Sequence, residues 1–138
     1  MGRILNYEFT KTVTHSTTEA TAQKWHLKLT AGIIHYIEIK FPAGCAGLVH
    51  VRLLHGIHPV IPLNAEDDIN GDNETIPFKE FYPISPGANI LDLQAWNEDE
   101  VYDHSISVRI GVLTEEELNP WVVLKDLATV LKTLTGVE

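Results

Sequence analysis

The chain of 138 residues has little sulfur and no long apolar run: it contains one cysteine, one methionine and no segment suited to cross a membrane. A lone cysteine cannot close an intramolecular disulfide, so the sequence points to no oxidising compartment. Alanine and glycine flank Cys45, which favours a small buried side chain over a reactive thiol. We also expect no signal peptide, because the first residues lack an apolar segment.

Basic side chains are scarce as well, with 10 Lys and Arg against 19 Asp and Glu, for a net charge of -9. The imbalance is greatest in residues 66–117, which carry 2 basic and 14 acidic side chains. A surface of this charge repels phosphate backbones, so we expect no nucleic acid partner. A basic protein surface or cations fit better, although most of these carboxylates are expected simply to face solvent.

Alternation of apolar and polar side chains is the main pattern in the chain. It is clearest in residues 33–41 and 48–55, where a period of two predicts strands with one buried face. Pro42, Gly44 and Gly47 lie between these segments and allow the chain either to reverse or to step to an opposing sheet. We expect the apolar residues of both segments in the core: Ile37, Ile39, Phe41, Val49, Val51 and Leu53.

Six further segments are predicted strands: 5–14, 24–29, 58–63, 76–82, 91–96 and 105–112. Two prolines make 58–63 an edge strand or an extended crossing. In 76–82 the alternation of apolar and polar residues slips between Phe78 and Phe81, which predicts a β-bulge. Eight short strands without a helix among them predict an all-β fold, an eight-stranded antiparallel sandwich of jelly-roll type over residues 1–113. The Thr- and Ser-rich residues 12–22 are expected as a mobile or partner-ordered arm.

Residues 114–138 change to a helical period and predict one C-terminal α-helix. Thr114 and Glu117 have the spacing of a capping box, and Asn119-Pro120 offers a second start. The helix is apolar around more of its surface than one sandwich face covers, so it docks either on its own domain or on another chain. We favour docking between chains, through Trp121, Val122, Leu124, Leu127, Leu131 and Leu134.

Oxygen ligands alternate at Asp68, Asn70 and Asp72, as they do in calcium-binding loops. Asn73 and Lys79 stand where the EF-hand pattern has glycine and a bidentate glutamate. Binding of a calcium or sodium ion by these three residues is a hypothesis, and a network of Asx turns is the favoured alternative. We expect no other cofactor.

Exposed aromatic side chains on a β-sandwich can hold sugar rings. Trp96 falls on the face opposite Leu91 and Leu93, so Trp96 and Tyr102 are candidate platforms, and a carbohydrate-binding module is the second function that we consider. The alternative is that Trp96 packs under its own loop. No two of the seven histidines are separated by one residue and no nucleophile motif is legible, so we expect no enzyme.

Residues 41–52, 71–76 and 95–110 (FPAGCAGLVHVR, GDNETI and AWNEDEVYDHSISVRI) resemble small proteins of tailed-phage structural gene clusters. The similarity covers residues 33–113. It implies a jelly-roll capsid decoration or auxiliary protein, which binds the outside of the shell and stabilises it.

On this resemblance we expect a non-enzymatic virion protein, assembled in the host cytoplasm. Its partner would be the major capsid protein or another virion protein, and it would form a homo-oligomer, with a trimer favoured. The resemblance carries over no catalytic residue and does not account for the C-terminal helix.

Overall fold

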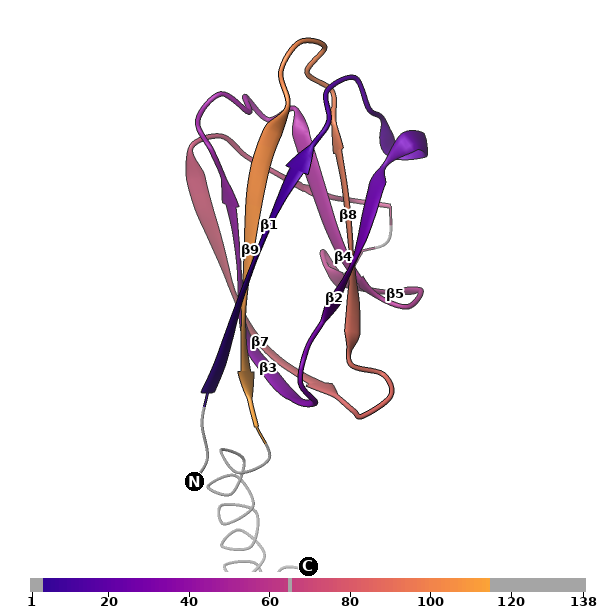
Figure 1. Cartoon of the computed structure of the whole chain (residues 1–138), viewed down its shortest axis with the longest axis vertical. Helices are drawn as coiled ribbons and strands as arrows, with labels where there is room; N and C mark the ends of the chain where they lie inside the picture. The colour runs from indigo at the N-terminus through magenta and orange to yellow at the C-terminus, as the bar shows by residue number, and fades with distance from the viewer. Residues whose placement is uncertain (1–3, 65, 115–138) are drawn as a thin grey trace, which may run out of the picture.

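The computed structural model describes residues 4–64 and 66–114 (Figure 1). Within these ranges it contains nine strands and one short 3-10 helix, η1. Their bounds are β1 Ile4–Val13, η1 Glu19–Thr21, β2 Gln23–Lys28, β3 Gly32–Phe41, β4 Val49–His55, β5 His58–Ile61, β6 Ile69–Asn70, β7 Glu74–Ile84, β8 Ile90–Asn97 and β9 His104–Leu113.

The strands form two antiparallel sheets that face each other, which confirms the predicted all-β sandwich (Figure 1). One sheet has the order β1-β9-β3-β7, and the other has the order β2-β8-β4-β5, with β6 paired to β4. All eight predicted segments are strands. The count of eight is nevertheless wrong, because the two residues of β6 pair with β4 inside what we expected to be a loop, with Ile69 beside Val51.

β3 and β4 lie in different sheets, so the chain steps across the sandwich between them instead of reversing. Gly44 and Gly47 have φ angles of 102° and 75° in this connection. Glycine adopts these angles without the steric cost that a Cβ brings, which is why the crossing can be so tight. Of the two alternatives that the sequence left open, the step to the opposing sheet is the one observed.

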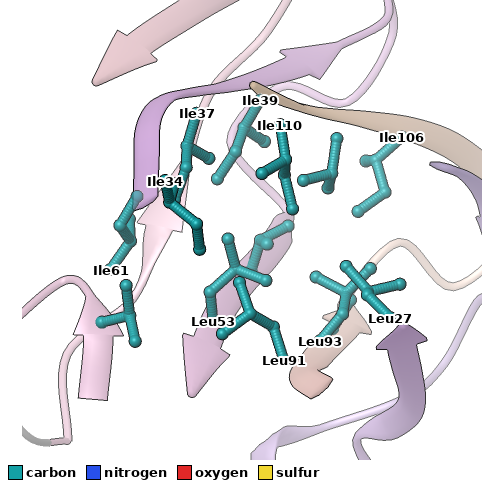
Figure 2. Packing of buried hydrophobic residues seen from close by; sticks show 14 of the residues in the cluster. Leu27, Ile34, Ile37, Ile39, Leu53, Ile61, Leu91, Leu93, Ile106 and Ile110 are labelled. Carbon is teal, nitrogen blue, oxygen red and sulfur yellow. The ribbon is translucent and has the colours of Figure 1, made fainter. Parts of the chain in front are cut away.

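The core lies between the sheets, and the alternation of the sequence assigns its residues correctly. Ile37, Ile39, Phe41, Val49, Val51 and Leu53 are all fully buried, as are the inward residues of β8 and β9. Figure 2 shows apolar side chains of the two sheets meeting face to face. Burial of this much apolar surface is the main term that stabilises the fold.

The predicted β-bulge is confirmed in β7. Ile34 pairs with Tyr82 and Tyr36 pairs with Lys79, so β7 has one residue more than β3 between the two pairs. On its other side β3 itself carries the extra residue, His35, because Ile34 and Tyr36 pair with the consecutive residues Val112 and Gly111 of β9. The extra residues bend both strands at one end of this sheet.

Residues 12–22, expected as a mobile or partner-ordered arm, are fastened to the domain. The first two belong to β1, and the backbone N–H groups of Ser16 and Thr17 donate to the carbonyl oxygens of Asp99 and Asn97 at 2.7 and 2.9 Å. The hydroxyl groups of Thr17 and Thr21 satisfy further backbone groups in this segment. The polar composition therefore serves a hydrogen-bonded connection between β1 and β2.

Ile4 pairs with Leu113, so both ends of the described chain leave the sandwich at the same end (Figure 1). Beyond Thr114, the predicted C-terminal helix and its proposed partner-binding residues lie outside the described residues. In the part of the chain that the structure describes, no helix is both long enough and apolar enough to span a membrane.

Cys45 is fully buried beside the crossing between β3 and β4, and burial raises the pKa of its thiol to about 11, with smaller contributions from Asp72 and Asp99. We therefore expect the folded protein to react with a thiol reagent such as DTNB at least roughly 100-fold more slowly than the protein in guanidinium chloride. Absorbance at 412 nm measures both rates. Rapid labelling of the folded protein would contradict this placement.

Candidate functional site

Trp96 lies on the outward face of its sheet, as predicted, but it is only 3% exposed. His50, its neighbour on β4, stacks on the indole at 5.1 Å between ring centroids, and the guanidinium of Arg52 lies 4.9 Å from the centre of the ring. Arg52 is held in turn by the carbonyl oxygens of Glu66 and Asp67 and by the carboxylate of Glu19. The indole of Trp96 is therefore covered by His50 and Arg52 and is not an exposed surface that a ligand could contact.

His50 joins this cluster to two carboxylates. Its Nδ1–H donates to Asp68 Oδ1 at 2.5 Å, and its Nε2 lies 3.3 Å from Glu98 Oε1 without forming a hydrogen bond. His50 and Arg52 together fasten residues 66–68 over the outside of the sheet. Cross-strand contacts of this kind stabilise a sheet face, so the plain role of the cluster is structural.

The three predicted calcium ligands are directed to different partners. Asp68 Oδ1 accepts a hydrogen bond from the Nδ1–H of His50. Asp72 Oδ1 accepts hydrogen bonds from the backbone N–H groups of Gly44 and Ala46, both at 2.9 Å. Asn70 is exposed in β6. Among the described residues there is no group of three or more His, Cys, Asp or Glu side chains arranged to hold a metal ion.

Calcium binding by this loop stays a prediction with a direct test. A cation that binds only the folded state raises the melting temperature. Calcium at millimolar concentration should then raise the melting temperature over an EDTA control, and Asp68→Asn should reduce the increase. An unchanged melting curve would reject the calcium site.

The loop between β8 and β9 is held by a dense network around Asn97 and Asp99. Asn97 is fully buried, and its Nδ2 donates to the carbonyl oxygens of Val13 and Tyr102. Asp99 Oδ1 accepts the backbone N–H groups of Val101 and Tyr102, while its Oδ2 accepts from His104 Nε2 at 2.9 Å. The loop is therefore fixed before any partner arrives.

The same bonds lower the pKa of Asp99 to about 2 from its ordinary 3.8, with the N–H of Val101 as the largest cause, followed by His104. Because the folded pKa is depressed, the carboxylate stabilises the folded state above pH 3.8 and loses this effect as the pH falls towards 2. We expect Asp99→Asn to be less stable than the wild type at pH 7 and to approach it in stability at pH 2–3. Urea titrations across this range measure the difference, and a gap that does not depend on pH would show that these hydrogen bonds do not depress the pKa.

At the tip of this fixed loop, Val101 and Tyr102 are 65% and 66% exposed. Glu98, Glu100 and Asp103 lie in the same loop, which makes it acidic. The loop sits at the end of the sandwich opposite to the ends of the described chain (Figure 1). An exposed apolar pair on a rigid acidic loop suits contact with a basic protein surface.

A second feature, which the strand pattern alone did not indicate, lies on the outer face of the four-stranded sheet. Arg109 on β9 is placed between two carboxylates, with its Nε 3.4 Å from Glu8 and its Nη1 3.3 Å from Glu38. The charge of Glu8 is the largest of the causes that raise the pKa of Arg109. Glu38 is the largest of the causes that raise the pKa of the Tyr36 phenol. The sequence contains the residues but not the register that brings the three strands together.

No protein-family model matches the chain, and no curated protein matches it. One similar solved structure comes from work described as "Bacillus endospore appendages form a novel family of disulfide-linked pili". It is 13% identical to this chain, with a TM-score of 0.48, and the match covers 83% of this chain and 92% of that one.

Proposed function

We propose that this chain is a non-enzymatic structural protein of a phage particle, a decoration or auxiliary protein that binds the capsid shell and stabilises it. The order of the strands carries the proposal. Successive strands from β1 to β4 alternate between the two sheets, and the orders β1-β9-β3-β7 and β2-β8-β4-β5 fit a jelly roll, with β6 as an addition. Viral capsid proteins are among the main users of that fold, which agrees with the sequence resemblance.

The loop end of the sandwich is the surface that we assign to the shell. Val101 and Tyr102 would enter an apolar depression, and the carboxylates around them would face basic side chains of the major capsid protein or another virion protein. Because the network around Asp99 already orders the loop, binding would cost little conformational entropy. The described chain ends at Thr114, at the opposite end of the sandwich (Figure 1), and we assign to residues 115–138 the role of joining copies of the chain.

The test of this assignment is binding to capsid shells. The gene neighbourhood identifies the major capsid protein, and shells assembled from that protein are mixed with the chain and sedimented. Val101→Asp should lower binding at least roughly tenfold, because it places a charge in an apolar contact. Ile57→Asp is the matched control, since Ile57 is 99% exposed in the turn between β4 and β5. Equal loss in both variants, or none, would reject the loop as the contact.

The proposed role of the C-terminal segment is tested separately by deleting residues 119–138, which removes Trp121, Val122, Leu124, Leu127, Leu131 and Leu134. If the segment joins chains, the shortened protein stays folded and soluble, and light scattering shows a smaller oligomer than the trimer that we favour. If the segment instead packs on its own domain, the shortened chain unfolds or aggregates.

The alternative function is a carbohydrate-binding β-sandwich module, and a jelly roll is compatible with it as well. The cover of His50 and Arg52 over Trp96 counts against that residue as a platform, whereas the exposure of Tyr102 leaves it accessible. On this alternative, a glycan array shows saturable binding that Tyr102→Ala abolishes. On the capsid proposal, the same substitution weakens shell binding and no glycan signal depends on it.

A further inference from the structure

The outer face of the four-stranded sheet contains a shallow hollow of about 340 Å³. Pockets that hold small molecules start at roughly 300 Å³, so this hollow is large enough for a ligand of one or two rings. It is far from the loop end in the fold, because its residues belong to the parts of β1, β3 and β9 nearer the ends of the described chain. It therefore lies apart from the loop end and from the face that carries Trp96, and it contains the Arg109 ion pairs described above.

Two rows of outward side chains build the hollow. Glu8, Arg109 and Glu38 are cross-strand neighbours in the first row, and Asn6, Gly111 and Tyr36 occupy the same positions in the second. Gly111 has no side chain, so the second row is low in its centre. The ring of His35 lies over this glycine, as a Cβ at Gly111 would come within 2.6 Å of its Nε2.

The polar groups of the hollow are held in place before a ligand binds. The ion pairs of Arg109 with Glu8 and Glu38 keep three planar groups at fixed positions on one side. Tyr36 and Glu38 both line the hollow, so the phenol ring of Tyr36 lies beside these groups. Donors and acceptors fixed in this way lose little entropy on binding, which is how pockets gain specificity.

The charges of this region select the class of ligand. The lining carries the two negative charges of Glu8 and Glu38 and the one positive charge of Arg109, which is paired with both carboxylates. A charged ligand would have to break these ion pairs, whereas a neutral ligand can form hydrogen bonds to the same groups while they stay paired. A compound rich in hydroxyl groups both donates to the carboxylates and accepts from the guanidinium.

We propose that this hollow binds a neutral sugar ring, with Tyr36 as its aromatic platform and Glu8, Glu38 and Arg109 as hydrogen-bonding partners of its hydroxyl groups. The aromatic ring suits the apolar C–H face of a pyranose, while the planar side chains suit its rim. The hollow thus assigns sugar binding to a different sheet from the one that carries Trp96. The proposal is independent of the capsid role, because it concerns the isolated chain.

The test uses the full chain and the methyl glycosides of glucose, galactose, mannose and N-acetylglucosamine as probes, with saturation-transfer NMR to detect binding and titration to measure Kd. At least one glycoside should bind saturably. Tyr36→Ala should weaken it roughly five- to tenfold, while Tyr36→Phe keeps most of the affinity because the ring remains. Ile57→Ala, which removes an exposed apolar side chain outside the hollow, should leave Kd unchanged.

Circular dichroism and melting curves show that each variant is folded, and Arg109→Gln provides a second variant that retains a planar polar group. The proposal is overturned if none of the four glycosides binds, or if folded Tyr36→Ala binds as tightly as the wild type. It is also overturned if Tyr36→Ala changes only the oligomeric state, since the face would then be an interface between copies. Loss of sugar binding leaves the shell-binding result of Val101→Asp untouched, so the two proposals fail separately.

Discussion

Replacing Gly32 with alanine is expected to destabilise the protein by roughly 2–3 kcal/mol, close to the upper end of the range for overpacking. A Cβ at this position would lie 2.2 Å from the carbonyl oxygen of Leu113 and 2.9 Å from Cγ1 of Val112. The first contact is with backbone in a paired strand, so β3 and β9 must move apart to relieve it. Urea denaturation followed by circular dichroism measures the loss.

Gly71→Ala is the matched control for this prediction. Its Cβ would meet Glu74 Oε1 at 2.5 Å, but that atom is the end of an exposed side chain, which can rotate away. We expect a smaller loss of about 0.5–1 kcal/mol, because only a side chain has to move, although it gives up the hydrogen bond that Glu74 Oε1 accepts from the backbone N–H of Asp72. Similar losses at Gly32 and Gly71 would show that the nature of the clashing atom does not decide the effect.

Asn97→Asp is expected to cost roughly 3–5 kcal/mol at pH 7, a large part of the stability of a typical domain. Asn97 is fully buried, and its amide nitrogen donates to two carbonyl oxygens, those of Val13 and Tyr102. Aspartate would place a carboxylate oxygen against both of them, which removes two hydrogen bonds and adds a buried charge. Chemical denaturation gives the difference in free energy.

Two further variants show whether the donor at Asn97 is what matters. Asn97→Ala leaves the same carbonyl oxygens without a partner but adds no charge, so a smaller loss of about 2–3 kcal/mol is expected. Asn73→Asp makes the same chemical change at an exposed residue and should have little effect. If Asn97→Asp were as stable as Asn73→Asp, the hydrogen bonds of the buried amide could not be important.

The layers of the fold were predictable because their cause is local. A strand with one buried face must alternate, so Ile37, Ile39 and Val51 were assigned to the core from the sequence alone. The slip in the alternation near Phe78 located the bulge of β7. β6 escaped prediction because two residues are too few to show a period. Its pairing depends on β4, about twenty residues away.

The sites were less predictable because their causes are not local. The sequence placed Trp96 on the outer face correctly, but its cover depends on Arg52 meeting carbonyl oxygens of the 66–67 segment and the carboxylate of Glu19. The alternation of Asp68 and Asp72 did not indicate that Asp68 would bond to the imidazole of His50. It also did not indicate that Asp72 would bond to the backbone N–H of Gly44, between β3 and β4. Register between distant strands decides such contacts, and a single sequence does not contain it.

The order of the strands also governs how the protein is made. β9, the last strand in the described chain, lies between β1 and β3, and β8 likewise lies between β2 and β4. Until both have left the ribosome, the strands β1 to β4 have unpaired edges, and about ninety residues separate β1 from β9, its only neighbour among the described strands. Both sheets can therefore be completed only late, through contacts between residues that are distant in the sequence. Contacts of this kind make folding slow. A nascent chain truncated before residue 104 lacks a central strand, and it is expected to need a chaperone or to aggregate.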